Sequence, residues 1–346
     1  MHNKLLVYGD ETLKLEEIVR GVQFSFPFLG FLTIHELAHY FIARRHKIKV
    51  SLPYYLPFWM GFMAMPSIGT LGAIIRIRER IKSRKVFFDI GIAGPLAGFL
   101  VALGVLYYGF THLPPQDHIF TIHPEYAMYG DNYAQHVYQE DTSTMALGNS
   151  LLFLFFKKFV ASDPTLIPNQ YELIHYPWIF AGYLALFFTV LNLFPIGQLD
   201  GGHILYGLLG GKKHAYVSLT LFFLFVFYAG LGLVSPQDSL EALLIEIPLY
   251  LGFLYATFQK LSVERITRLS MALSVFTAQL LVLHWQPYWV GYQGWLLFAF
   301  LLGRVIGVYH PPTSQNAPLD TKRKVLGWVA LFIFVICFSP QPFIMN

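Results

Sequence analysis

The chain has 346 residues, of which 55% are hydrophobic and only 13% are charged. A soluble domain carries about twice that charged fraction, so the composition excludes an ordinary soluble enzyme and favours a protein with many membrane spans. The net charge of +4 follows from the positions of basic residues along a membrane protein, and we expect no binding to nucleic acid. The single cysteine, Cys337, excludes an intrachain disulfide and a zinc site built from cysteines.

The first half of the chain predicts one span followed by a segment that enters the membrane without crossing it. The first long apolar run covers residues 22–43 and ends in the basic cluster 44–49, which places residues 1–21 outside the cytosol. The next apolar stretch, 51–75, contains three prolines and three glycines, too many helix breakers for a spanning helix. Because basic residues also follow it, we expect a re-entrant, β-like segment with both ends on the cytosolic side.

The remaining apolar runs alternate with basic and acidic connections in the same way. Residues 111–143 contain no Lys or Arg, which predicts an external loop. Including a last span at 325–338, the pattern predicts an all-α polytopic membrane protein with about six to eight transmembrane helices. We expect His175, His284 and His310 to lie at membrane interfaces.

Three ionisable residues lie inside the first apolar run. Placing an ionisable side chain in the membrane costs several kcal/mol, so these three residues indicate a functional site. His35, Glu36 and His39 form the pattern His-Glu-x-x-His. This spacing puts both imidazoles on one face of a helix with a carboxylate beside them, an arrangement suited to bind zinc and to activate a water molecule. A buried pair satisfied by hydrogen bonds is the structural alternative.

Two histidines leave a catalytic zinc ion one protein ligand short. Asp200 is the best candidate for the third ligand, because its carboxylate suits zinc and it follows the apolar run 178–194 near the inner membrane face. The alternative is that Asp200 caps a helix starting near His203.

The two motifs together resemble the site-2 protease family of membrane-embedded zinc metalloproteases. The resemblance rests on His-Glu-Leu-Ala-His at 35–39 and Asn-Leu-Phe-Pro-Ile-Gly-Gln-Leu-Asp-Gly-Gly at 192–202, with further matches at 69–72 and 93–98. It implies that His35, His39 and Asp200 bind one Zn²⁺ ion per chain. It also implies that Glu36 activates water and that Asn192 orients or polarises the substrate carbonyl. The segment 111–143 is too short and too polar to be the PDZ domain of better-known members.

The resemblance suggests a division of the chain into a segment 1–21, a catalytic membrane core 22–210 and C-terminal membrane helices 211–346. A transmembrane substrate must unwind before its peptide bonds can be attacked, and the segment around Gly69 and Gly72 could bind the extended backbone as an added strand. Simple turn formation explains these two glycines equally well. Glycines 94 and 98 are expected to permit close helix packing.

We therefore expect an intramembrane zinc endopeptidase that cleaves transmembrane protein substrates in the lipid bilayer of the cell membrane, with its active site near the cytosolic face. A polytopic membrane transporter and a non-catalytic membrane scaffold that contains zinc are the alternatives. Paired charged spans in two halves of the chain would favour a transporter, and they are missing from the sequence. Glu36 argues against a scaffold, because a purely structural zinc site has no use for a base.

Overall fold

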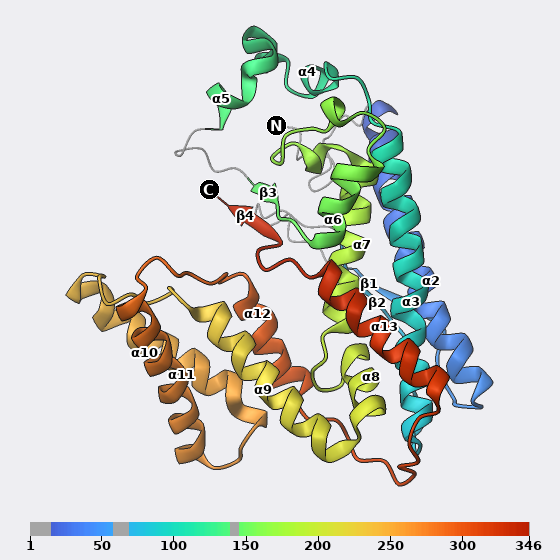
Figure 1. Ribbon diagram of the computed structural model, residues 1–346, viewed down its shortest axis with the longest axis vertical. Helices are drawn as coiled ribbons and strands as arrows, with labels where there is room; N and C mark the ends of the chain where they lie inside the picture. The colour runs from blue at the N-terminus through green and yellow to red at the C-terminus, as the bar shows by residue number, and fades with distance from the viewer. Residues whose placement is uncertain (1–14, 58–68, 139–144, 346) are drawn as a thin grey trace. The chain divides into compact units, whose positions relative to one another are not determined.

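A computed structural model describes residues 15–57, 69–138 and 145–345 of the chain. It consists mainly of helices, with two small antiparallel sheets (Figure 1). The chain separates into two compact units. The first comprises the described residues up to Ile81, Ile92–Asn192 and the residues from Phe332 onward, and the second comprises Lys82–Gly91 and Leu193–Leu331.

Three long helices form the centre of the first unit. They are α2 (Leu15–Arg45), α3 (Arg84–Thr111, whose first turns belong to the second unit) and α7 (Pro177–Leu193). Aromatic rings join α2 to α7, with 5.2 Å between the ring centroids of Phe24 and Phe180 and 5.5 Å between those of Phe28 and Phe188. Gly182 of α7 packs on Leu106 of α3. These contacts hold α2 within a tightly packed helical core.

Two short sheets also belong to the first unit. Strands β1 (Tyr54–Pro57) and β2 (Thr70–Ile74) pair antiparallel with an irregular register after Tyr55. This pairing agrees with the β-like segment predicted at 51–75, whose middle, 58–68, lies outside the described residues. Strand β3 (Met145–Leu147) pairs antiparallel with β4 (Phe343–Met345), so the end of the chain lies beside a segment two hundred residues earlier (Figure 1).

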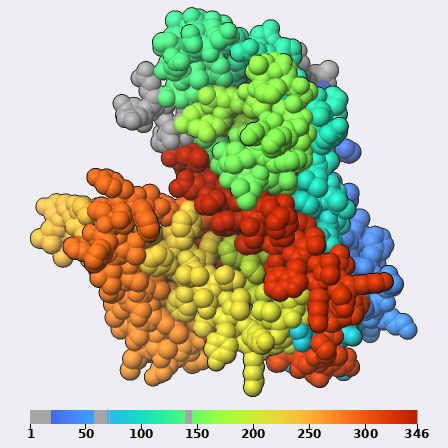
Figure 2. Space-filling view, in the orientation of Figure 1, coloured from blue at the N-terminus to red at the C-terminus, as the bar shows by residue number. Residues whose placement is uncertain are grey.

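The segment predicted as a loop, 111–143, contains short helices in its described part. They are α4 (His118–Ile122), a 3₁₀ helix η2 (Pro124–Asn132) and α5 (Tyr133–Val137). None of the residues of η2 and α5 is buried, and Figure 2 shows this part of the chain at the surface. Helix α6 (Leu151–Phe155), the π-helical turn η3 (Phe156–Val160) and the 3₁₀ turns η4 (Pro164–Leu166) and η5 (Leu173–His175) lead to α7.

The second unit is helical. Its helices are α8 (Asp200–Leu209), α9 (Gly211–Gly230), α10 (Leu240–Thr257), the 3₁₀ turn η6 (Phe258–Lys260), α11 (Arg265–Trp285), α12 (Trp295–Phe300), the π-helical turn η7 (Leu301–Ile306) and the first part of α13 (Thr321–Cys337). Arg323 of α13 makes a bidentate ion pair with Asp89 of α3, with N···O distances of 2.7 and 2.8 Å. The ion pair ties the start of α13 to the first turns of α3.

Within the described residues, four helices are long and apolar enough to cross a membrane: α3, α9, α11 and the continuous segment of α10 and η6. Helices α7 and α12 with η7 are shorter and apolar. Helix α2 has 31 residues but is not among the four, because His35, Glu36 and His39 lower its hydropathy. The mostly helical membrane architecture agrees with the sequence, whereas the count of six to eight spans stays a prediction.

Candidate metal centre

The His-Glu-x-x-His motif lies in the middle of α2, buried in the first unit. His35, Glu36 and His39 expose only 2%, 9% and 6% of their surfaces. Residues four apart lie one helical turn apart on the same face, so the two imidazoles face one another. Their Nε2 atoms are 3.1 Å apart and their ring centroids 4.8 Å apart.

Helix α3 covers these histidines, and two glycines permit its close approach (α2 and α3 run side by side in Figure 1). A Cβ atom at Gly94 would lie 2.1 Å from Nε2 of His39. At Gly98 it would lie 2.8 Å from the ring of Phe31 and 3.1 Å from Nδ1 of His35. Any larger side chain would have to displace the rings, so the packing role predicted for these glycines agrees with the structure.

The donor set fits a zinc ion. Two nitrogen ligands of tetrahedral zinc, each about 2.0–2.1 Å from the metal, lie roughly 3.3 Å from each other. The 3.1 Å separation of the Nε2 atoms of His35 and His39 is close to that value. Two buried imidazoles with neighbouring Nε2 atoms, and a buried glutamate on the same helix, offer what a catalytic zinc site requires from a single helix.

Asp200 belongs to the second unit, where it is the first residue of α8. The residue before the helix is Leu199, and its carbonyl accepts the N–H of His203 at 2.9 Å. The alternative prediction that Asp200 caps a helix near His203 is therefore wrong, because the helix begins at Asp200 itself. Its assignment as the third ligand stays a prediction.

The sequence around Asp200 builds a tight turn ahead of α8. Gly197 has a φ of +62°, a conformation that favours glycine. Its N–H donates to Oγ of Ser218 at 3.0 Å, and that hydroxyl donates to the carbonyl of Val308 at 2.7 Å. A Cβ at Gly201 would lie 1.9 Å from the carbonyl oxygen of Leu193. The first turn of α8 therefore packs directly on the preceding backbone, which fixes where the helix starts.

The other predicted site residues lie in the first unit. Asn192 is half-buried in the last turn of α7. Gly69 and Gly72 have φ angles of +81° and +113°, which explains the choice of glycine through backbone conformation. Gly69 lies in a bend just before β2, as turn formation predicts, whereas Gly72 lies within the strand. The hydroxyl of Thr70 accepts the N–H of Gly72 at 3.0 Å. The substrate-binding role of the glycines and the role of Asn192 stay predictions.

The sheet of β1 and β2 packs on the helices that surround the motif. The hydroxyl groups of Thr33 in α2 and Tyr55 in β1 form a hydrogen bond, two residues before His35. A Cβ at Gly72 would lie 3.7 Å from the ring of Phe188 in α7, and that ring contacts Phe28 of α2. The small sheet is therefore fixed to the helix that carries the motif.

Sequence reasoning did not anticipate a histidine network in the second unit. Nδ1 of His203 and Nε2 of His310 are 2.8 Å apart, and the ring of Tyr206 stacks on His310 with 3.8 Å between centroids. The hydroxyl of Tyr206 is also 2.8 Å from Oγ1 of Thr313. No spacing rule connects residues 107 positions apart. The loop around His310 therefore braces α8, the helix that starts at Asp200.

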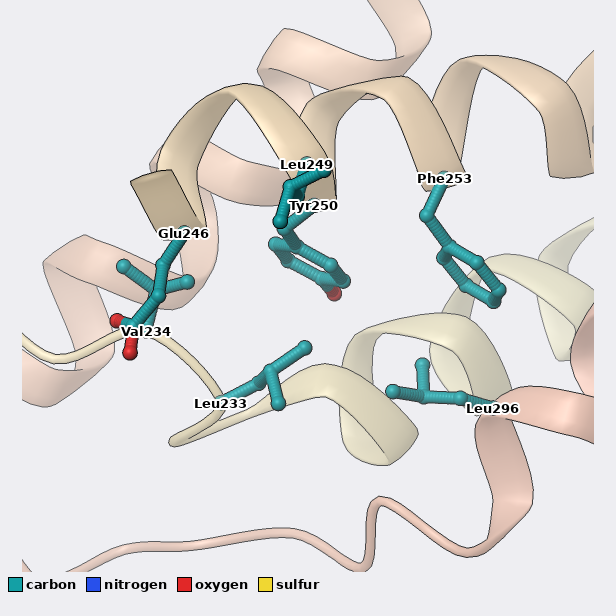
Figure 3. A pocket seen from close by; sticks show the side chains of 7 residues that line it. All are labelled: Leu233, Val234, Glu246, Leu249, Tyr250, Phe253 and Leu296. Carbon is teal, nitrogen blue, oxygen red and sulfur yellow. The ribbon is translucent and has the colours of Figure 1, made fainter. Parts of the chain in front are cut away.

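A pocket in the second unit has too few ionisable side chains in its lining to form a metal centre. It has a volume of about 330 Å³ and lies beside α10 (Figure 3), lined by Leu233, Val234, Glu246, Leu249, Tyr250, Phe253 and Leu296. Glu246 is its one carboxylate, and α10 continues unbroken past Pro248. A single carboxylate among apolar side chains is no metal centre and no acid–base pair.

The structure thus describes a helical membrane protein with a buried His-Glu-x-x-His centre. The model of peptidase family M50, the site-2 protease family, matches residues 23–234, more than half of the chain. The chain belongs to peptidase family M50, which confirms the resemblance drawn from the two motifs.

Curated relatives agree with this family. The "Probable zinc metalloprotease EGY2, chloroplastic" of Oryza sativa subsp. indica is 30% identical over 219 residues, which cover 63% of this chain and 34% of that protein. The "Probable zinc metalloprotease EGY1, chloroplastic" of Oryza sativa subsp. japonica is 27% identical over 237 residues, or 67% of this chain and 35% of that protein. The chain spans about a third of the length of these relatives. No solved structure matches it.

Proposed function

We propose that the chain is an intramembrane zinc endopeptidase that hydrolyses peptide bonds within or near transmembrane segments of other membrane proteins. The observation that carries the proposal is the buried pair of His35 and His39, with Nε2 atoms 3.1 Å apart, and Glu36 on the same helix. Membership of peptidase family M50 and the names of the relatives support it.

In this proposal His35, His39 and Asp200 hold one Zn²⁺ ion. When bound, zinc lowers the pKa of water toward about 7 and polarises a peptide carbonyl. The two imidazoles must be neutral to bind it, because a ring nitrogen that carries a proton cannot donate its lone pair to the metal. Asp200 adds a negative charge that balances part of the charge of the ion.

Glu36 is the proposed general base. Its carboxylate accepts a proton from the attacking water and later donates that proton to the leaving amine. The amide of Asn192 donates a hydrogen bond to the substrate carbonyl and stabilises the negative charge that develops on its oxygen. Burial of the motif keeps bulk water away from this exchange, so that each polar contact acts more strongly.

The substrate reaches the base only in an extended conformation, because a helix shields each peptide carbonyl with its own hydrogen bonds. We propose that the sheet of β1 and β2 accepts the unwound segment as an added strand. Its packing on α2 and α7 supports this proposal. Gly69 and Gly72 carry no side chain, so a substrate backbone can approach them closely.

The membrane arrangement is part of the proposal. We propose six to eight spans in the cell membrane, with residues 51–75 re-entrant, residues 1–21 outside and the active site near the cytosolic face. The catalytic core is 22–210 and the C-terminal helices are 211–346. The positions of Lys and Arg in the sequence support this orientation, and the apolar helices support a membrane location.

Glu36→Gln tests the activity. The chain is reconstituted in vesicles with a single-span reporter protein whose span carries glycine near its cytosolic end, and cleavage and zinc content are both measured. We expect zinc to stay bound while turnover falls by roughly two to four orders of magnitude. Glu241→Gln, an exposed residue in the first turn of α10, is the matched control and should cleave normally. Normal cleavage by Glu36→Gln would refute the assignment of Glu36 as general base, whereas no cleavage by the unsubstituted chain would leave a transporter or a zinc-containing scaffold.

A further inference from the structure

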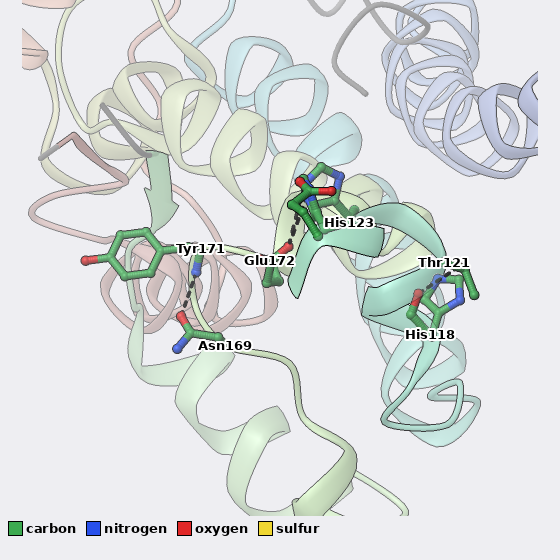
Figure 4. Close-up of polar contacts among 8 residues, drawn as sticks. His118, Thr121, His123, Asn169, Tyr171 and Glu172 are labelled. Carbon is green, nitrogen blue, oxygen red and sulfur yellow. Dashed lines mark hydrogen bonds and ion pairs between the residues drawn. The ribbon is translucent and has the colours of Figure 1, made fainter. Parts of the chain in front are cut away.

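A second group of metal-ligating side chains lies in the first unit, away from the His-Glu-x-x-His motif. His123 follows α4, whereas Glu172 and His175 lie on the segment that leads into α7. Figure 4 labels His123 and Glu172. The Nε2 atoms of His123 and His175 are 3.3 Å apart. Oε2 of Glu172 is 3.9 Å from the first and 3.6 Å from the second. Three ligand atoms from two chain segments thus converge on one point.

Glu172 is the unusual member of this cluster. Only 1% of its surface is exposed, and within the described residues neither carboxylate oxygen has a hydrogen-bond partner. Distances of 3.6 and 3.9 Å to the imidazoles are too long for hydrogen bonds. A buried carboxylate without a hydrogen bond costs several kcal/mol unless it is protonated or a cation compensates it, so a bound cation is one of two ways to stabilise Glu172.

The imidazole of His123 is held in the orientation that a ligand needs. Oε1 of Glu125 lies 3.2 Å from Nδ1 of His123, on the side of the ring opposite to the cluster. The ring of Tyr126 stacks on the imidazole with 4.4 Å between centroids. Metal-binding histidines commonly donate their second ring nitrogen to a carboxylate, which fixes the tautomer in which the lone pair of Nε2 can bind the metal.

We propose that His123, Glu172 and His175 bind a second divalent transition-metal ion, zinc, in addition to the ion at the His-Glu-x-x-His motif. The point equidistant from the three ligand atoms lies about 2.1 Å from each, as zinc–nitrogen and zinc–oxygen bonds require. Two imidazoles and one carboxylate are a zinc donor set. Both histidines are partly exposed, at 19% and 16% of their side chains, so a water molecule can complete the coordination.

The bound ion has a structural consequence. His123 and His175 are 52 residues apart in the sequence, and a shared metal ion links the segment after α4 directly to the start of α7. None of the residues of η2 and α5 is buried, so side-chain packing does little to hold this surface segment. The bound ion would restrict the motion of the segment. This second site does not depend on the peptidase activity proposed above.

Cobalt binding to the full chain in detergent tests the second site in isolation. The parent variant is His35→Ala/His39→Ala, which removes the first site, and Co²⁺ is the probe because its visible absorption reports protein ligands. We expect this variant to retain about one Co²⁺ ion per chain. Adding Glu172→Gln should abolish binding, whereas adding His136→Ala should not, because His136 is an exposed histidine of the same segment. A parent variant that binds no cobalt overturns the proposal.

Chemical protection tests the native chain without any substitution. Diethyl pyrocarbonate modifies exposed histidine nitrogens, and mass spectrometry identifies the modified residues. With zinc bound, we expect His123 and His175 to be protected at least tenfold relative to the chelated chain, whereas His136 reacts equally in both. Equal modification with and without zinc means that the cluster is an ion pair of a protonated histidine with Glu172, and it overturns the metal site. Loss of cleavage in Glu36→Gln leaves both results unaffected, so the two proposals fail separately.

Discussion

Gly94→Ala tests whether the close approach of α3 positions His39. The added Cβ would lie 2.1 Å from Nε2 of His39, 2.5 Å from Cδ2 and 2.6 Å from Cε1. An ordinary van der Waals contact needs 3.4 Å or more, so the imidazole or α3 must move by roughly 1 Å, a displacement that can reduce catalysis by about 100-fold. The alanine adds about 0.5–1 kcal/mol of helix propensity, which overpacking costs of about 1–3 kcal/mol exceed.

Two other glycines of α3 give a graded series. Gly98→Ala would place Cβ 2.8 Å from the ring of Phe31 and 3.1 Å from Nδ1 of His35, so we expect a smaller loss. A Cβ at Gly104 meets nothing within 4 Å, which makes Gly104→Ala the matched control. Zinc affinity and cleavage are measured for each variant and should both decrease in the order Gly104→Ala, Gly98→Ala, Gly94→Ala. Normal zinc affinity and cleavage in Gly94→Ala would refute the packing argument.

Two further predictions concern the second unit. Asp200→Ala should lower bound zinc and cleavage together, because it removes a ligand; full zinc content with normal cleavage would exclude Asp200 from the site. Burial lowers the pKa of His310 to about 4, in a setting formed by His203, Tyr206 and His214. The stability contributed by neutral His310, roughly 3 kcal/mol at most, is complete above pH 6.5 and lost as the pH falls toward 4. The melting temperature of His310→Gln should therefore depend less on pH in that range than the melting temperature of the control His284→Gln, which changes an exposed histidine. An equal pH dependence of the two melting temperatures would contradict the prediction.

Features that depend on neighbouring residues could be predicted from the sequence. The spacing of His35 and His39 determines that they share a helical face, and the structure brings their Nε2 atoms to 3.1 Å. The family could likewise be predicted from the sequence, because two local motifs identify it and the family model covers both motifs. The β-like character of the segment around β1 and β2 followed from its proline and glycine content. The roles of the site residues stay predictions.

Features that depend on distant segments could not be predicted in this way. The pairing of β3 with β4 joins the end of the chain to residues 145–147, and neither segment has a pattern that selects the other. The contact of His203 with His310 and the cluster around Glu172 also arise only when separate segments pack. The sequence alone suggests Asp200 as a helix cap, because aspartate favours that position. The close packing of Gly201 on the preceding backbone instead starts α8 at Asp200.

A membrane span is recognised by its apolar residues, and the proposed catalysis requires polar groups in α2, which is why α2 is not among the four helices that are apolar enough to cross a membrane. The helix that holds the motif must carry two imidazoles and a carboxylate. Those groups lower its hydropathy while burial hides them: at most 9% of His35, Glu36 and His39 is exposed. The two imidazoles face α3 and its glycines, and Phe26 and Phe41 of α2 are exposed. The exposed aromatic residues of α2 are therefore consistent with the membrane span predicted for this helix, which its mean hydropathy alone does not indicate.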